Sequence, residues 1–304
     1  MIYITVAGQT FGIETKKQEA MLARMARNYG AFMQPDAPSG NLLFTASIDG
    51  PVALPEDKPL VTFRYDLTED SAVLRIYPSC RILSIRHASS GRVFSMVCPV
   101  RLPGTEADIP YTFTADLTTQ GIAPPGHILD HLLIFALSVA GLGRGILLIH
   151  ASTVVYRGRA VMFLGESGTG KSTHSRMWLE NIAGTSLLND DAPAVRIAPD
   201  GSVTAYGTPW SGKTPCYRAE SYPLAALVRI RRAPCNRITA QDTLRALGAV
   251  LPSCLPTLQQ DDATLDPLCA ALSQLLSRTP VYILDCLPDA DAARVSCGAV
   301  FAKR

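Results

Sequence analysis

The sequence has few charged residues for its length. Lys, Arg, Asp and Glu make up 18% of the 304 residues, against about 25% in typical soluble domains. The 28 basic residues nearly balance the 26 acidic ones, so the net charge is +2. This balance argues against a nucleic-acid-binding protein, which usually has a basic excess or a stripe of Lys and Arg. Intrinsic disorder is excluded too, because 47% of the residues are apolar and disordered chains have few apolar residues.

Paired cysteine motifs are also missing. The eight cysteines are widely spaced and none forms a CxxC, which argues against a zinc ribbon or a thioredoxin-type site. We therefore expect reduced, mostly buried thiols. The first 17 residues lack the basic segment and apolar run of a secretory signal peptide. The sequence predicts a cytoplasmic protein.

One apolar run, residues 128–149, is about long enough to cross a bilayer. It contains Asp130, His131 and Arg144, and a Gly-x-Gly break interrupts it. A charged side chain in mid-membrane costs ~2.5–3.5 kcal/mol even on a lenient insertion scale. A buried helix followed by a buried strand explains the run better, and we expect no membrane partner.

Proline and glycine divide the chain into two parts, as its length allows. Residues 1–122 are expected to form a strand-rich domain of unassigned role, with one helix over residues 16–29. Residues 123–304 alternate strands and helices, so the fold class expected is mixed α/β. Helices are predicted over residues 127–140, 171–181, 241–250 and 264–277. Strands are predicted over residues 1–6, 42–48, 60–65, 72–77, 81–87, 92–99, 145–156, 160–164, 186–189, 194–197, 203–206, 224–231 and 281–286.

The segment after the predicted strand 160–164 is a complete Walker A phosphate loop, GESGTGKST. Glycines permit the positive φ angles that wrap backbone amides around phosphate oxygens, and the following helix directs its positive N-terminal end at the same anion. Lys171 is expected to reach the β- and γ-phosphates, and the Ser172 hydroxyl to bind Mg²⁺. The predicted nucleotide-binding residues are Gly165, Glu166, Ser167, Gly168, Thr169, Gly170, Lys171, Ser172 and Thr173.

Two adjacent carboxylates, Asp190 and Asp191, follow an apolar run some twenty residues after the loop. Acidic residues at a strand end near a phosphate loop usually anchor the metal or its waters. One carboxylate of such a pair serves the metal and the other accepts a proton from an attacking hydroxyl. The alternative is a solvated turn, since Asp-Asp before Ala-Pro is also good turn chemistry.

Three further side chains are weaker candidates for the catalytic site. His150 ends a predicted strand and precedes Lys171 by 21 residues; taken alone, it is more typical of a core histidine. Lys213 and Arg218 lie in a Gly- and Pro-rich loop, residues 207–218, which is long enough to close over phosphates and stabilise transferred charge. An ordinary surface loop remains the alternative.

The elements HAS, FLGESGTGKST and LLNDDAPAV together resemble the catalytic core of the HPr kinase/phosphorylase family, whose fold is shared with phosphoenolpyruvate carboxykinase. The likeness is firm over residues 145–195 and less specific to residue 301. It implies that Lys171 and Ser172 hold phosphates and Mg²⁺, and that Asp190 and Asp191 are the metal-associated and base carboxylates, in an order left open. It also implies an active-site place for His150. Thr173 stands where the family usually has Glu.

The function expected is therefore an ATP- and Mg²⁺-dependent phosphotransferase acting on a hydroxyl of a peptide, a small protein or a small molecule. Two alternatives stay open: a nucleotide-binding regulator with little turnover, and a carboxykinase-like enzyme. An oligomer is compatible with the sequence.

Overall fold

The computed structural model describes residues 1–67, 69–100, 110–117, 125–212 and 214–302. The chain is a mixed α/β protein with two large sheets, as expected. It divides into two compact units, which we call unit 1 (Met1–Gly143 with Thr257–Asp266) and unit 2 (Arg144–Pro256 with Pro267–Arg304). The division after unit 1 thus falls at Gly143 rather than at residue 122, because the helix that follows residue 125 packs with the N-terminal strands.

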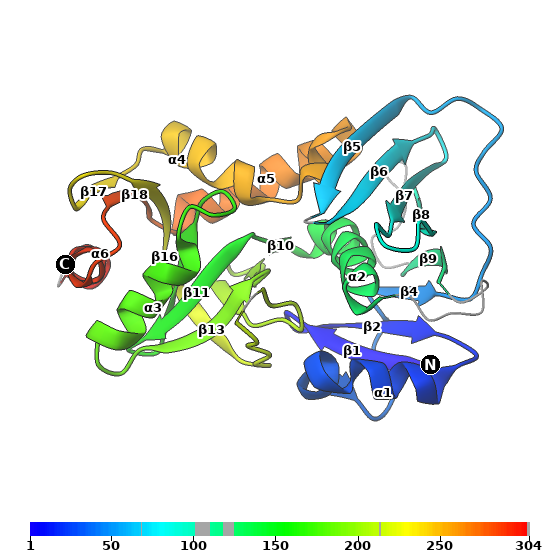
Figure 1. Cartoon of the computed structure of the whole chain (residues 1–304), viewed down its shortest axis with the longest axis horizontal. Helices are drawn as coiled ribbons and strands as arrows, with labels where there is room; N and C mark the ends of the chain where they lie inside the picture. Colours follow the sequence, from blue (N-terminus) through cyan, green and yellow to red (C-terminus); the bar gives the residue numbers. More distant parts are fainter. Residues whose placement is uncertain (68, 101–109, 118–124, 213, 303–304) are drawn as a thin grey trace. The chain divides into compact units, whose positions relative to one another are not determined.

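Unit 1 is built on a nine-stranded sheet in the order β3-β1-β2-β4-β9-β8-β7-β6-β5 (Figure 1). Its pairs are antiparallel except β2 with β4 and β4 with β9. The strands are β1 (Ile2–Val6), β2 (Gln9–Glu14), β3 (Met33–Gln34), β4 (Phe44–Ser47), β5 (Val61–Leu67), β6 (Asp70–Ile76), β7 (Cys80–Arg86), β8 (Val93–Pro99) and β9 (Tyr111–Asp116). The helices are α1 (Gln18–Tyr29) and α2 (Gly126–Gly141), with short 3₁₀ turns at Gly30–Phe32, Leu142–Arg144 and Pro256–Gln259.

The buried face of this sheet is fixed by apolar residues that alternate along each strand. Phe44 on β4 stacks on Phe11 with ring centroids 4.5 Å apart and meets Phe113 edge to face at 5.2 Å. All three rings are fully buried. The sequence predictions missed β2 and β9, which carry two of these rings, because Thr and Gly break the apolar pattern there.

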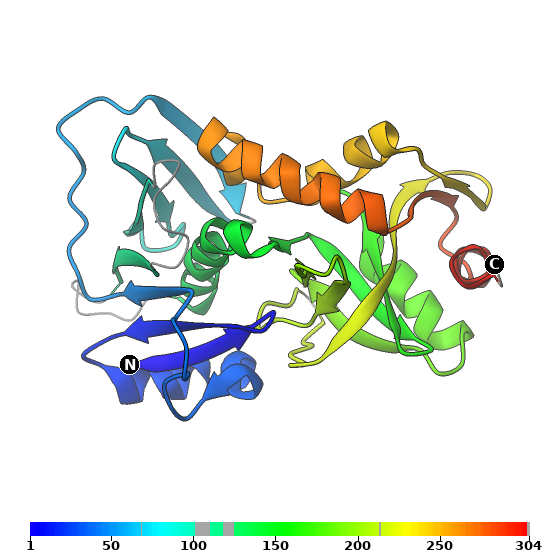
Figure 2. The ribbon, with the colours of Figure 1, turned by 180° about the vertical axis from the view of Figure 1, so that it is seen from behind.

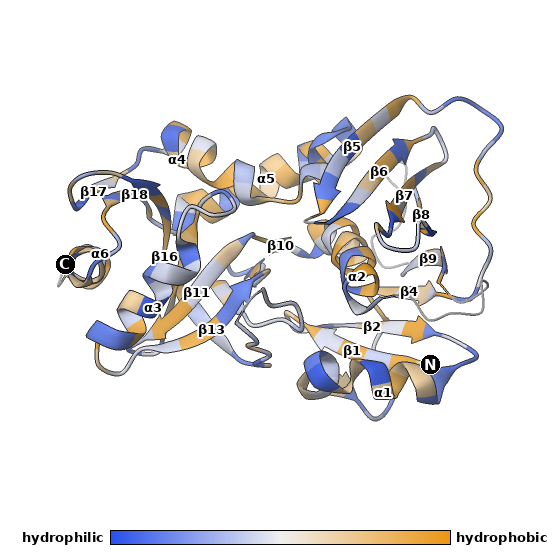
Figure 3. Ribbon diagram, viewed as in Figure 1, coloured by the Kyte–Doolittle hydropathy of each residue, from blue (hydrophilic) through white to orange (hydrophobic). Residues whose placement is uncertain are grey.

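Helix α2 accounts for the long apolar run. The segment Gly126–Arg144 is long and apolar enough to cross a membrane, yet 67% of its most apolar window is buried inside the protein. Leu132, Leu133 and Phe135 are at most 1% exposed, and Figure 3 shows the apolar character of this helix. A helix apolar on almost every side is typical of a core helix, and a buried strand follows, as expected.

Asp130 is a partly buried carboxylate of this helix. The Tyr29 hydroxyl donates to its Oδ1 at 2.6 Å, and the Asn28 amide lies at 3.5 Å. Burial raises the pKa of Asp130 to about 6, although these hydrogen bonds and the charges of His127 and Arg24 act in the opposite direction. The native carboxyl therefore holds its proton more tightly than the unfolded chain does.

We expect Asp130→Asn to stabilise the protein in a pH-dependent way. The ordinary pKa is 3.8 and the native one about 6, so the carboxyl's contribution to stability is lost as pH rises between these values. The uncharged amide avoids that loss, and the free energy of unfolding should rise by about 2 kcal/mol at about pH 8 and hardly at all near pH 4. Urea unfolding at both pH values measures this, with the exposed Asp57→Asn as control. An equal gain at both pH values contradicts the prediction.

A return segment, Thr257–Asp266, completes unit 1 from far along the sequence. Asp261 in it accepts two hydrogen bonds from Arg81 of β7, at 2.7 and 2.8 Å. The Arg81 side chain is only 4% exposed. Bidentate pairing of this kind satisfies a buried guanidinium that otherwise has a large desolvation cost.

Unit 2 is built on a second nine-stranded sheet, shown from behind in Figure 2. Its path is β10-β14-β15-β16-β12-β11-β13, with β18 added beside β16 and β17 beside β18. The strands are β10 (Ile146–Leu148), β11 (Ala151–Tyr156), β12 (Arg159–Leu164), β13 (Ser186–Asp191), β14 (Ala194–Ile197), β15 (Val203–Tyr206), β16 (Ser221–Arg232), β17 (Arg237–Ala240) and β18 (Val281–Cys286). The helices are α3 (Lys171–Asn181), α4 (Thr243–Val250), α5 (Asp262–Arg278), which begins in the return segment, and α6 (Ala290–Phe301), with a 3₁₀ turn at Leu251–Ser253.

Most predicted elements of unit 2 are confirmed, and one is corrected. The predicted strand over residues 145–156 is two strands, because the chain leaves the partner of β10 at Ile149 and joins β12 and β13 from Ala151 onward. His150 lies at this break, where its backbone N–H donates to Ser253 O at 2.7 Å. The histidine thus lies just after β10 and before β11, close to the strand end predicted for it.

Helix α3 is held against α6 by a buried polar group. The Trp178 indole donates to Ser296 Oγ at 2.9 Å, and His174 Nε2 lies 3.1 Å from the same oxygen. Ser296 Oγ in turn donates to Ala292 O. Burial lowers the pKa of His174 to about 4, so this imidazole is neutral and serves packing and hydrogen bonding. All eight cysteines, each within the described residues, are free; Cys235 is exposed.

Candidate functional site

The glycine-rich segment 165–173, which the sequence predicts to bind phosphate, occupies the turn between β12 and α3. β12 is a buried strand ending at Leu164, and α3 begins at Lys171. Gly168 and Gly170 have φ angles of +77° and +114°, which residues with a Cβ rarely adopt. Gly170 is also the residue that caps the N-terminus of α3. The predicted sequence of strand, glycine-rich turn and helix is thus present, with the helix N-terminus at the loop.

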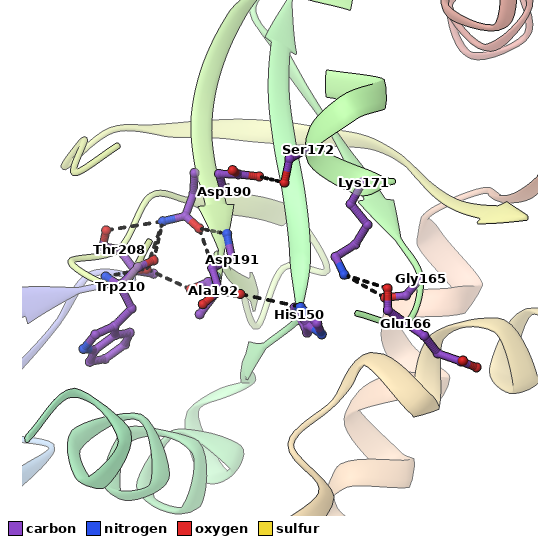
Figure 4. Close-up of polar contacts among 11 residues, drawn as sticks. His150, Gly165, Glu166, Lys171, Ser172, Asp190, Asp191, Ala192, Thr208 and Trp210 are labelled. Carbon is purple, nitrogen blue, oxygen red and sulfur yellow. Dashed lines mark hydrogen bonds and ion pairs between the residues drawn. The ribbon is translucent and has the colours of Figure 1, made fainter. Parts of the chain in front are cut away.

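Lys171 folds back onto the loop. Its Nζ donates to Gly165 O at 2.9 Å and to Glu166 O at 3.2 Å (Figure 4). Burial lowers the pKa of Lys171; Asp191 and Asp190 act in the opposite direction and Arg229 in the same one. An ammonium group held by two carbonyls at the mouth of the loop is positioned to exchange them for anionic oxygens.

The loop serine meets the first aspartate of the pair. Ser172 Oγ donates to Asp190 Oδ1 at 2.8 Å, as Figure 4 shows. The contact exists because β13 pairs with β11 in a register that sets Asp190 opposite Ser152, and Ser152 itself touches α3 through Ser175 at 2.7 Å. Asp190 is 5% exposed. A hydroxyl and a carboxylate of different elements are thereby brought to one point.

The second aspartate faces His150. Asp191 Oδ1 and His150 Nε2 are 3.5 Å apart, and each side chain is nearly half exposed. Partial burial, reinforced by Lys171, lowers the pKa of His150 to about 4, so the pair is a neutral imidazole beside a carboxyl and not an ion pair. Burial and Asp190 raise the pKa of Asp191 against the effect of Lys171. Asp191 is therefore more basic than an ordinary aspartate.

Asn189, which was not predicted as a site residue, forms hydrogen bonds with the backbone on either side of the two aspartates. Its Oδ1 accepts from the backbone N–H groups of Asp191 and Ala192, both at 3.0 Å. Its Nδ2 donates to Trp210 O at 2.9 Å and Thr208 Oγ1 at 3.1 Å. A fully buried asparagine with all its atoms engaged fixes the loop after β15 against the two aspartates. The available signal was a polar residue ending the apolar stretch just before Asp-Asp.

The loop 207–218 passes the aspartate pair, as its backbone shows. The Gly212 N–H donates to Asp190 O at 2.7 Å, and a Cβ on Gly212 would lie 2.8 Å from that oxygen. Lys213, a predicted catalytic residue, lies outside the described residues. Arg218 is held by Glu220, with Nε to Oε1 at 2.9 Å, and donates to Leu187 O. Its predicted role in catalysis stays a prediction.

Arg229 is a second residue the sequence analysis missed. Parallel pairing of β16 with β12 places it level with Leu164, the last residue before the loop. One guanidinium nitrogen donates to Ala249 O at 3.0 Å and another lies 3.6 Å from Glu166 Oε1. The side chain is 16% exposed. A cation 65 residues downstream thus stands beside the loop, which no local pattern indicates.

A pocket of about 360 Å³ opens beside the loop and the first turn of α3. Thr169, Gly170 and Thr173 form its loop side, and the ends of β16 and β18 with Pro288 form the other. Arg232 borders it and donates to Gly168 O and Thr169 O. Such a volume suits a small organic group.

Comparison with protein-family models and with curated proteins finds no match for this chain.

Proposed function

We propose that this protein is a P-loop phosphotransferase with an HPr-kinase-like, phosphoenolpyruvate-carboxykinase-like core, which transfers the γ-phosphoryl group of ATP to a hydroxyl. The observation that carries the proposal is the 2.8 Å contact between Ser172 Oγ and Asp190 Oδ1. It joins the hydroxyl of a Walker A loop to a carboxylate on a neighbouring strand, and a second carboxylate, Asp191, follows directly in sequence. A simple glycine-rich turn has no need of this arrangement.

The residues at this point fit a magnesium ion. Ser172 and Asp190 offer hard oxygen ligands, of the kind Mg²⁺ prefers together with phosphate oxygens and water. In the proposal these two side chains hold the ion, directly or through water. When bound, the ion offsets the negative charge of the phosphates.

The chain's own groups divide the remaining work. The loop amides and Lys171 position the β- and γ-phosphates. Asp191, whose pKa burial raises above the ordinary value, accepts the proton of the acceptor hydroxyl as the hydroxyl oxygen attacks the γ-phosphorus and the bond to the β-phosphate oxygen breaks to release ADP. His150, neutral and next to Asp191, orients the carboxylate or the hydroxyl. The pocket beside Thr173 receives the base and sugar of the nucleotide.

The experiment that tests this function is transfer of labelled phosphate. The purified protein is incubated with γ-labelled Mg-ATP and a lysate of its host, and labelled products are found by mass spectrometry. Label on a serine, threonine, tyrosine or small-molecule hydroxyl supports the proposal. Tight ATP binding with neither hydrolysis nor transfer rejects it in favour of a nucleotide-binding regulator, and label on a carboxylate product favours a carboxykinase-like enzyme.

Arg229 is expected to offset transferred charge. Because it lies beside Glu166 at the base of the loop and is mostly buried, Arg229→Gln should lower turnover by about 100-fold. Steady-state turnover of the variant measures this, with a thermal melt to confirm folding. The matched control is Arg237→Gln, an arginine 72% exposed, which should stay within about threefold of wild type.

Arg218→Gln completes the comparison, since the sequence analysis assigned the same role to Arg218. A larger loss in Arg218→Gln than in Arg229→Gln would transfer the role to Arg218. In that case the loop 207–218, and not β16, supplies the cation.

A further inference from the structure

Three side chains capable of binding a metal converge in unit 1, away from the phosphate loop in the sequence. Asp70 opens β6, His87 follows β7, and His127 lies in the first turn of α2. One ligand atom of each residue lies within 4.8 Å of the ligand atoms of the other two. The three residues are therefore close enough to share one ion. His131, one turn after His127, faces the same side of α2.

Asp70 is the buried member of the group. Its side chain is 4% exposed, and Oδ2 lies 2.7 Å from His127 Nε2. Oδ1 accepts from the Ala88 N–H at 2.8 Å. A buried carboxylate therefore lies beside the two imidazoles.

Serine hydroxyls in the connection after β7 hold the His87 ring. His87 Nδ1 lies 2.8 Å from Ser90 Oγ, the kind of hydrogen bond that fixes the other ring nitrogen toward a metal. Ser89 Oγ lies 3.3 Å from that other nitrogen, Nε2, and would be displaced by the ion. The His87 and His127 rings have centroids 5.8 Å apart. The His127 side chain is 53% exposed, so solvent and ions reach the group.

We infer that Asp70, His87 and His127 bind one Zn²⁺ ion. Two imidazoles and a carboxylate form a ligand set that suits zinc, with a fourth position open to water, whereas magnesium and calcium prefer oxygen ligands alone. A ring nitrogen and a carboxylate oxygen on one tetrahedral zinc lie roughly 3.3 Å apart. The Asp70–His127 contact thus needs to open by only about half an ångström as the metal replaces the shared proton.

Such an ion would tie three segments together. Along the chain, 17 residues separate Asp70 at the start of β6 from His87 after β7, and 40 more separate His87 from His127 in the first turn of α2. Because a metal that binds only the folded state stabilises it, the site would hold the N-terminus of α2 against the start of β6 and the end of β7. The competing interpretation is a simple hydrogen-bonded Asp70–His127 pair.

Zinc titration of the whole chain distinguishes the two. The protein is stripped with a chelator, saturated with Mg²⁺ to occupy oxygen-rich sites, and titrated with Zn²⁺ by calorimetry. We expect one Zn²⁺ per chain, and a loss of affinity of about 100-fold in Asp70→Asn and in His87→Gln. The matched control is His150→Gln in unit 2, which should bind Zn²⁺ as wild type does. Equal binding in wild type and both ligand variants, or no saturable binding, overturns the inference.

A second measurement guards against misfolded variants and against the free cysteines. Co²⁺ in place of Zn²⁺ should give visible d–d bands of nitrogen and oxygen ligation in wild type, lost in His87→Gln. A thiolate-to-cobalt charge-transfer band would assign the binding to cysteine and overturn the inference. A rise in wild-type melting temperature with Zn²⁺ that is absent in folded His87→Gln supports it. The test does not depend on phosphotransfer, so its failure leaves the proposed function untouched.

Discussion

Lys171→Ala is expected to abolish ATP turnover, with a loss of about 1,000-fold or more. Lys171 Nζ now bonds Gly165 O and Glu166 O at 2.9 and 3.2 Å, and it is the ammonium group that would turn from these carbonyls to the phosphates. Alanine leaves the loop backbone and its positive-φ glycines in place. Binding should weaken less than turnover, because the loop amides and the N-terminus of α3 still face the anion.

The measurement is phosphate release and transfer at saturating Mg-ATP, with nucleotide affinity determined separately by calorimetry. Lys58→Ala, on an exposed stretch of unit 1, controls for the loss of one positive charge. Full turnover in Lys171→Ala would remove the Walker A lysine from the mechanism and, with it, the assignment as a P-loop phosphotransferase.

The two aspartates should separate into different kinetic phenotypes. Asp190 shares a hydrogen bond with Ser172, so Asp190→Asn should raise the Mg²⁺ concentration needed for half-maximal activity by about tenfold or more. Asp191 has the raised pKa, so Asp191→Asn should lower turnover by about 10²–10⁴-fold at unchanged Mg²⁺ requirement. These phenotypes would assign the two roles that the sequence left open.

The pH dependence of turnover tests the role of Asp191 as the base. A base acts only when deprotonated, so wild-type turnover should fall as pH falls through the pKa of Asp191, which lies above the ordinary 3.8. That acid limb should vanish in Asp191→Asn. Turnover and its pH and Mg²⁺ dependence in both variants provide the check, and interchanged phenotypes would reverse the assignment of the two carboxylates.

The phosphate-loop region was predictable because its determinants are local. The helix Lys171–Asn181 and the strands Ala194–Ile197 and Val203–Tyr206 begin and end at the predicted residues. The glycine-rich Walker A motif marks the start of the helix, and the Asp200-Gly201 turn separates the two strands. The Asp-Asp pair was found for the same reason. Its contact with Ser172 follows from two neighbouring strands and a helix that are close in sequence.

What the sequence could not supply depends on pairings between distant segments. Arg229 reaches Glu166 only because β16 runs parallel to β12 in a particular register. The group Asp70, His87 and His127 comes together through β6, β7 and α2, and no spacing along the chain indicates it. The expected boundary at residue 122 failed to place α2 with unit 1, since a proline-glycine break marks a turn and not which core the next helix enters.

The return segment has a consequence for how the protein is made. During synthesis the ribosome releases Arg81 long before Asp261, its bidentate partner 180 residues later. Until then the β7 strand carries a guanidinium that its final surroundings bury almost completely, and breaking such a buried pair costs about 3–5 kcal/mol. The N-terminal unit therefore reaches its finished state only after most of unit 2 has emerged, and a fragment ending at residue 143 lacks part of its own core.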